Sequence, residues 1–224
     1  MPGVPTVRPL RLDDVPAVSR MLARAFAQDP TTVWFFPGVR RRQRRLERFY
    51  AIEVLTLLDA GEGWVTEDRE AAALWLPVGR PPERPPGRAH LGRQLRWNLA
   101  AAWLLGRRLP RAAATMIRVQ QRHPREPHWY LACLGTAPER QGRGLGSAVL
   151  APVLERCDRT GTPAVLDTAT AEDVRFYQRR GFEVTAEVAR PGAPHLWVMR
   201  RAPGAAPAAA GTPGRSPAEE RVPG

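Results

Sequence analysis

A glycine-rich segment from Gln141 to Ser147 stands between a strand-like stretch and a helix-like stretch of the sequence. A turn that opens a helix presents free backbone N–H groups and the positive end of the helix dipole. Glycine also allows a bulky anion to approach the backbone closely. The segment therefore predicts a diphosphate-binding site at a strand–turn–helix junction.

The common phosphate-binding motifs do not fit this segment. Gly142, Gly144 and Gly146 lack the spacing of the dinucleotide-binding fingerprint. The P-loop requires a Gly-Lys-Ser/Thr sequence, and the chain contains no lysine. The glycine pattern alone therefore leaves the identity of the phosphate ligand open.

The net charge of +12 comes from arginine alone, because none of the 34 basic residues is lysine. Together with 24 prolines and 19 glycines, this bias is typical of GC-rich coding rather than of a selected basic surface. We therefore expect no nucleic-acid partner, although a positive surface attracts anionic ligands. The densest run, Arg40 to Arg45, is interpreted as a solvated helix face, with an acidic partner or a phosphate-bearing ligand as alternatives.

The length of 224 residues and the 43% hydrophobic content fit one domain with a packed core. Two cysteines, Cys133 and Cys157, are too few for a disulfide framework or a four-cysteine zinc site, and we expect no metal. The longest apolar run, Leu99 to Leu105, is too short to cross a membrane, so no membrane partner is expected. The N-terminal stretch lacks a signal-peptide core, which favours a cytoplasmic location.

The sequence pattern of the N-terminal half predicts a strand, two helices, a hairpin and an insertion. The expected elements are a strand at Val7–Leu12, a helix from Val15 with Asp13 or Asp14 as N-cap, a helix from Val39 to Asp59, and strands at Gly63–Glu67 and Ala71–Leu76. The first helix is expected to end at Asp29-Pro30. Residues 77–127 are expected to form a Pro-rich loop, Pro77 to Gly87, followed by two helices between His90 and Gln121.

The C-terminal half alternates strands and helices before a low-complexity tail. We expect strands at His128–Thr136, Pro163–Thr168, Phe182–Val188 and Leu196–Arg200, the last two paired, and helices at Gly144–Arg159, kinked at Pro152, and Thr170–Arg180, ended by Gly181. Residues 1–200 are thus expected to form the domain. The tail, residues 201–224, is rich in Pro, Ala and Gly, and we expect it to be disordered.

The order of four segments in this half carries a family resemblance. The segments are Leu131 to Pro138, Gln141 to Gly146, Leu166 to Thr168, and Phe176 to Phe182. Together they resemble the GNAT superfamily of acetyl-CoA-dependent N-acetyltransferases, with its Gln/Arg-x-x-Gly-x-Gly/Ala and Tyr-x-x-x-Gly-Phe signatures. The clear resemblance covers about Trp129 to Val188, and His123 to Tyr130 is similar to a subgroup of bacterial acetyltransferases. It implies an α/β fold: a GNAT-like mixed, mostly antiparallel sheet, splayed at its centre, with helices on both faces.

The resemblance also implies how acetyl-CoA would bind. The backbone of Leu134, Gly135 and Thr136 would face the pantetheine arm. The diphosphate would bind the backbone of Gln141, Gly142, Arg143, Gly144, Leu145, Gly146 and Ser147. The side chain of Arg143 is expected either to contact phosphate or to lie in solvent.

The expected reaction is direct attack of an amine on the thioester. A strand N–H near Leu134 to Thr136 would stabilise the oxyanion. Tyr177 occupies the position of the family's general acid, which would protonate the thiolate; the alternative is that Tyr177 only packs. Glu126 and Asp167 are candidate bases for the amine, each with a structural role as its alternative. Asp29, with His128 behind it, completes that set of candidates.

Two further residues bear on the expected site. Asp173 stands where relatives often carry Asn, which puts one cofactor contact in doubt, but Thr170 to Asp173 also fits a capping box. Cys133 lies beside the expected cleft and is interpreted as a small core residue.

Three function classes remain open from the sequence. The first is an N-acetyltransferase acting on a small-molecule or peptide amine, as a monomer or homodimer. The second is a non-catalytic CoA-binding sensor or scaffold. The third, a nucleic-acid binder, lacks any recognised motif. The acceptor is expected to bind between the N-terminal helices, the 77–127 insertion and the end of the cleft.

Overall fold

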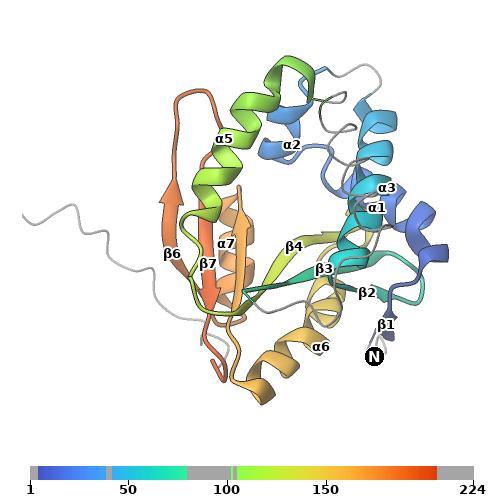
Figure 1. The fold of residues 1–224 in the computed structure, drawn as a ribbon. Helices are drawn as coiled ribbons and strands as arrows, with labels where there is room; N and C mark the ends of the chain where they lie inside the picture. The colour runs from blue at the N-terminus through green and yellow to red at the C-terminus, as the bar shows by residue number, and fades with distance from the viewer. Residues whose placement is uncertain (1–4, 39–41, 80–101, 103–104, 206–224) are drawn as a thin grey trace, which may run out of the picture.

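A single open sheet organises the computed structural model, which describes residues 5–38, 42–79, 102 and 105–205 (Figure 1). Its strand order is β1-β2-β3-β4-β5-β7-β6. The strands are β1 (Val7–Pro9), β2 (Glu62–Thr66), β3 (Ala71–Val78), β4 (His128–Thr136), β5 (Ala164–Thr168), β6 (Phe182–Val188) and β7 (Leu196–Arg201). Only β4 and β5 pair in parallel, and the other pairs are antiparallel, which confirms the expected mixed sheet.

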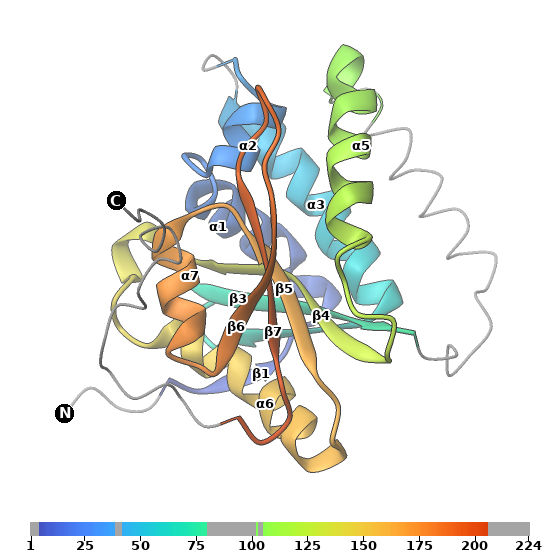
Figure 2. The same ribbon diagram turned by 90° about the vertical axis from the view of Figure 1, so that its left-hand side faces the viewer.

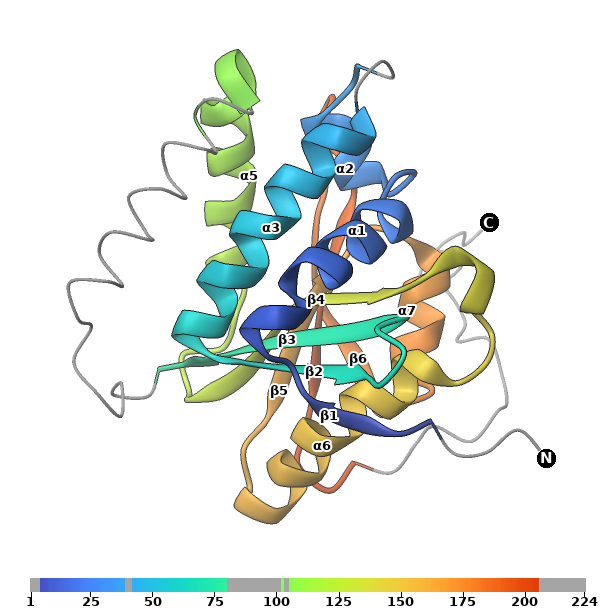
Figure 3. The same ribbon diagram turned by 90° about the vertical axis from the view of Figure 1, so that its right-hand side faces the viewer.

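Helices cover both faces of this sheet, as expected (Figures 2 and 3). They are α1 (Val15–Ala25), α2 (Pro30–Phe35), α3 (Arg42–Ala60), α5 (Leu109–Gln120), α6 (Leu145–Thr160) and α7 (Ala171–Gln178). On one face, α1 and α3 pack over Leu74 and Cys133. On the other face, α6 packs over Trp75 and Leu131. Adjacent residues of a strand point to opposite faces, so the sheet supplies both cores.

A third apolar cluster joins α5 to the C-terminal strands. Val119 of α5 packs with Val165 of β5, Leu196 and Val198. Leu166, which follows Val165 in β5, packs instead in the core under α6. By alternation along β5, α5 therefore covers the same face of the sheet as α1 and α3.

The N-terminal segments differ from expectation in three places. The first strand ends at Pro9 and is followed by a short 3-10 helix, Leu12–Asp14. Asp14 precedes α1 but does not cap it, because its carboxylate binds Arg8 (2.6 Å) and Arg69 (2.6 Å) instead. Helix α1 ends at Ala25, before the pair Asp29-Pro30 that was expected to end it. The Asp29 carboxylate instead accepts the N–H of Thr32 (2.8 Å) and caps helix α2, which was not expected.

The remaining elements follow the expected order with shifted ends. The strand β3 continues through Pro77 to Val78, and β7 continues through Arg201. Pro110 lies in the first turn of α5, where its missing N–H is no loss, and Pro152 lies within α6. The rest of the Pro-rich loop, most of the first insertion helix and tail residues 206–224 lie outside the described residues. Within the part of the chain that is described, no helix has the length and apolar character needed to span a membrane.

Candidate active site

The strands β4 and β5 separate after a short paired stretch. They pair only at Trp129–Ala164, Tyr130–Val165 and Leu131–Leu166. Beyond Leu131, β4 runs on to Thr136 beside β3, whereas β5 runs on to Thr168 beside β7. Figure 2 shows the two halves of the sheet turning away from each other. This opening, called the fork here, confirms the expected splay and leaves one edge of β4 without a partner strand.

A β-bulge lies in β4 exactly where the fork begins. Cys133 pairs with Leu74 and Leu131 pairs with Trp75, so Ala132 has no partner residue in β3. Ala132 and Cys133 consequently pack toward the same core, under α1 and α3. Bulges bend a strand and occur often beside active sites. This bulge could not be predicted from the sequence, because a bulge depends on the register of the neighbouring strand.

Helices on both faces of the sheet hold the β4 residues whose backbone is expected to contact the cofactor. A side chain on Gly135 would clash with Leu22 of α1, so glycine is needed here for close helix packing. Leu134 packs with the α6 core, and Thr136 lies next to Gly146 of α6. The side chains of these β4 residues are thus committed to packing, and the main-chain groups of the free edge remain for a ligand.

The glycine-rich turn connects β4 to α6. Gly142 and Gly144 have φ angles of 74° and 81°, which other L-residues rarely adopt. The first helical bond of α6 runs from the Ala148 N–H to the Gly144 carbonyl (3.0 Å). The N–H groups of Leu145, Gly146 and Ser147 precede that bond, and residues 141–144 are exposed. The turn therefore presents main-chain N–H donors at the start of a helix, although the N–H of Gln141 donates to the Pro138 carbonyl (3.4 Å).

An arginine that the sequence analysis missed lies beside this turn. The guanidinium group of Arg180 donates to Ser147 Oγ and to the Phe176 carbonyl, and it lies 3.5 Å from the centre of the Phe176 ring. Burial lowers the pKa of Arg180. No carboxylate among the described residues forms an ion pair with it. The pair Arg179-Arg180 before Gly181 was the only available signal. Arg143, in contrast, is exposed.

Tyr177 lies in the apolar core between α7 and the sheet. Its ring contacts Phe176 and Phe182, with centroids 5.1 and 5.6 Å away. Burial raises the pKa of Tyr177, and the negative charges of Asp173 and Asp167 add to the rise. The phenol is therefore protonated at neutral pH, as an unperturbed phenol with a pKa of about 10 also is.

A carboxylate lies near the end of β5, where the fork begins. Asp167 is the first residue of β5 beyond the last pair with β4. Its Oδ1 accepts the Tyr130 hydroxyl (3.0 Å) and lies 3.3 Å from His123 Nε2. The side chains of Asp167 and His123 are 14% and 10% exposed. The fork thus has an acidic, largely enclosed corner on the α5 side of the sheet.

The other candidate bases have partners away from the Asp167 corner. The Glu126 carboxylate pairs with Arg200 (2.7 Å) and lies ahead of β4, where β4 and β5 are still joined. His128 is fully buried and donates from Nδ1 to the Glu126 carbonyl (2.8 Å). Burial lowers the pKa of His128, which keeps its ring neutral. Asp29 caps α2, and burial raises its pKa.

Asp173 and Cys133 have local roles. Thr170 caps α7 by accepting the Asp173 N–H (3.1 Å), as expected. Asp173 Oδ2 accepts the hydroxyls of Thr170 (2.6 Å) and Thr168 (3.1 Å), so this oxygen is engaged at the start of its own helix. Burial raises the pKa of Cys133 far above its usual range, which fits a core thiol.

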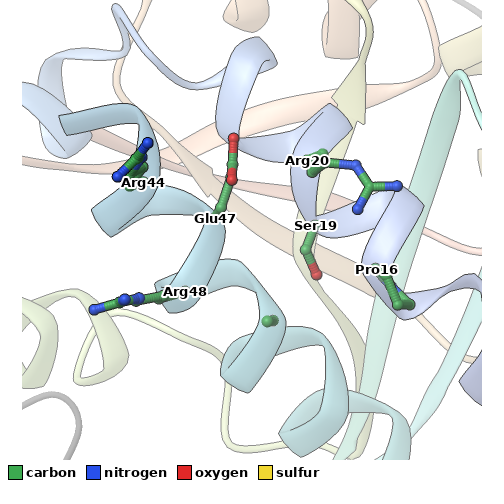
Figure 4. Close-up of a pocket in the computed structure, with 7 residues that line it drawn as sticks. Pro16, Ser19, Arg20, Arg44, Glu47 and Arg48 are labelled. Carbon is green, nitrogen blue, oxygen red and sulfur yellow. The ribbon is translucent and has the colours of Figure 1, made fainter. Parts of the chain in front are cut away.

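The arginine run belongs to a different surface. Arg44 and Arg48 of α3 and Arg20 of α1 line a hollow of about 470 Å³ between the two helices, with Glu47 among them (Figure 4). Arg42, however, donates to the carbonyls of Phe36 (3.0 Å) and Ala27 (3.3 Å), so it ties α3 to the α2 region rather than being only solvated. Arg40 and Arg41 lie outside the described residues. No cluster of metal-binding side chains occurs in the described part of the chain.

Comparisons with known proteins agree with this geometry. Residues 63–182 match the sequence profile of the acetyltransferase (GNAT) family. Among solved structures, the chain is similar to a histone acetyltransferase HPA2 and related acetyltransferase from Corynebacterium glutamicum (22% identity, TM-score 0.63, 90% of this chain and 98% of that one). It is also similar to the ribosomal-protein-S18-alanine N-acetyltransferase from Escherichia coli (14% identity, TM-score 0.50, 92% and 97%). At these identities the structures show a shared fold.

Proposed function

The chain belongs to the GNAT family of acetyltransferases, and from that premise we propose that it transfers an acetyl group from acetyl-CoA to an amine. The observation that carries the proposal is the free edge of β4, which leads into a turn and the N–H groups that begin α6 ahead of its first helical bond. A long ligand with a diphosphate at one end and a reactive group at the other matches this shape. Acetyl-CoA is such a ligand.

The residues of the fork fit acetyl-CoA. Its diphosphate would bind the N–H groups between Gln141 and Ser147, where the helix dipole also favours an anion. Arg180 supplies a positive charge beside Ser147 without a competing carboxylate among the described residues. The pantetheine arm would bond to the main chain of Leu134 to Thr136 along the free edge.

The reaction follows from what surrounds the fork. The amine nitrogen forms a bond to the acetyl carbon, and the carbon–sulfur bond breaks. A main-chain N–H between Leu134 and Thr136 stabilises the developing oxyanion. Tyr177 gives its proton to the departing thiolate, whose conjugate thiol has a pKa of about 8.5. Asp167, on the opposite face of the sheet, is the carboxylate that we expect to help the amine lose its proton.

Two measurements test this function. Calorimetry with acetyl-CoA tests binding, and thiol release with a panel of small amines, amino sugars and peptide N-termini tests transfer. Tyr177→Phe should keep acetyl-CoA affinity but lower kcat by roughly 100-fold or more, the usual contribution of a general acid. Wild-type protein that releases no heat with acetyl-CoA would refute the proposal.

The competing function is a CoA-binding sensor or scaffold without catalysis. Tight binding of acetyl-CoA with no transfer to any amine in the panel would favour it. The carboxylate and the imidazole that meet at the fork support the enzyme. The acceptor class, cytoplasmic location and a monomeric or dimeric state are part of the same proposal.

A further inference from the structure

Three side chains from three separate segments meet at the fork. His123 comes from the loop after α5, Tyr130 from β4 and Asp167 from β5. His123 Nε2 lies 3.3 Å from Asp167 Oδ1, which is ion-pair distance, although the N–H direction is not aligned as a hydrogen bond. The Tyr130 hydroxyl donates to the same oxygen (3.0 Å), and its ring lies 5.1 Å from the His123 ring. The carboxylate is thereby held between an imidazole and a phenol.

The second imidazole of this region, His128, has a different role from His123. The His128 ring is 5.9 Å from the His123 ring and edge-on to it. Its Nδ1 proton is used by the Glu126 carbonyl, so Nε2 carries the lone pair and has no partner among the described residues. Two adjacent imidazolium ions would repel each other. His128 is buried and its Nδ1 proton is engaged, whereas His123 is the imidazole that lies against Asp167.

The surrounding charges favour the same assignment. The groups that face His123 are Asp167 and Tyr130, with His128 behind them. Farther out, Glu126 and Arg200 pair with each other at 2.7 Å, so their charges largely cancel. Glu53 of α3 also acts electrostatically on Tyr130, so the corner carries the negative charges of Asp167 and Glu53.

We propose that His123 accepts the proton of the acceptor ammonium group and that Asp167, held by Tyr130, positions it. This assignment rests on the proposed acetyl transfer. His123 Nε2 faces Asp167, and the ring's other nitrogen, Nδ1, takes the proton. The freed amine attacks the acetyl carbon, and the thiolate takes one proton through Tyr177. The nitrogen loses its second proton as the amide forms, and this proton replaces the one that Tyr177 gave to the thiolate. The imidazolium of His123 returns its proton to solvent, so each turnover releases one proton.

The test compares three variants of the full chain. His123→Ala removes the acceptor, and Asp167→Asn removes the positioning charge. His195→Ala is the matched control, because His195 also pairs with a carboxylate, Glu187 (2.8 Å), but does so on the β6–β7 hairpin. For each variant we would measure acetyl-CoA affinity, thermal unfolding, and kcat with the best amine of the panel, with and without added imidazole.

The expected result is a selective loss in kcat. His123→Ala should lose roughly 100-fold or more, as for other general bases, with acetyl-CoA affinity unchanged. Added imidazole should restore activity to His123→Ala but not to Asp167→Asn. The defect of His123→Ala should also shrink as pH rises toward the pKa of an ordinary amine, about 10.4, because more acceptor is then already neutral. His195→Ala should behave as wild type.

Three results would overturn the assignment. A kcat of His123→Ala equal to wild type overturns it alone, while acetyl transfer by the wild type still stands. Loss of kcat together with acetyl-CoA affinity and melting temperature, without rescue by imidazole, assigns His123 a purely structural role. A wild-type protein that binds acetyl-CoA but acetylates no amine overturns the proposed function and this assignment together.

Discussion

Replacing Gly135 with alanine tests how tightly the fork is built. A Cβ at this position would come closer than 3.0 Å to Leu22 Cδ2, a separation that real Cβ atoms essentially never show. Leu22 is fully buried, so it has little room to move. The φ angle of Gly135 is not among the positive ones, so the cost of alanine is steric rather than conformational. Overpacking of this kind costs about 1–3 kcal/mol of unfolding free energy.

Shortening the neighbour should relieve the clash. Leu22→Ala alone should cost about 2–5 kcal/mol, because it leaves a cavity under α1. In the double variant the new methyl group occupies part of that cavity. The double variant should therefore be less destabilised than the sum of the single variants, by roughly 0.5–3 kcal/mol, the usual coupling of residues in contact.

Urea unfolding of the wild type, the two single variants and the double variant measures this coupling. Gly142→Ala serves as the control, since its Cβ would meet no atom within 4 Å and its cost comes only from the positive φ. The Gly142→Ala cost should add to that of Leu22→Ala without coupling. Because Gly135 lies at the free edge of β4, acetyl-CoA affinity should fall in Gly135→Ala and recover in part in the double variant. Strict additivity of Gly135→Ala and Leu22→Ala would refute the packing argument.

Three further outcomes follow from the site and its surroundings. Gly144→Ala should cost about 1–2 kcal/mol at a φ of 81° and weaken acetyl-CoA binding in calorimetry, whereas unchanged binding would argue against the turn as the diphosphate site. Arg180→Met should weaken acetyl-CoA binding more at low than at high salt; a salt-independent loss would assign Arg180 to packing alone. Hydrogen bonds from Arg8 depress the pKa of Asp14, so this group stabilises the fold above the unfolded pKa of about 3.9 and loses that contribution as pH falls. Asp14→Asn should thus lower the melting temperature at neutral pH by an amount that shrinks on acidification, and an equal deficit at all pH values would contradict the ion-pair explanation.

The part of the fold with strong local signals was predictable from sequence. The strand His128–Thr136 was predicted with the bounds that it has, because a continuous apolar run leads up to a glycine-rich turn. Thr170 was predicted as a cap because its partner is three residues away. The prediction that the Asp14 side chain caps the next helix was wrong. The carboxylate binds the distant Arg69 instead of the N–H groups of that helix.

Two of the misses share one physical cause, which is dependence on distant residues. The bulge at Ala132 is set by its register against β3. The contact between His123 and Asp167 joins two segments that only the β4–β5 pairing brings together. Helix α2 was missed for a different reason: Asp29-Pro30 is both a good end for one helix and a good start for the next, and both occur here within a few residues.

Because β4 and β5 pair over a short stretch, the sheet is joined by few hydrogen bonds between these two strands. Three residue pairs form the seam between a four-stranded half and a three-stranded half of the sheet. Partial opening of the molecule should begin at this seam, since few backbone hydrogen bonds must break there. Amide hydrogens along the seam should then exchange with solvent sooner than those between β3 and β4. A ligand that bridges both halves would brace the seam and slow that exchange.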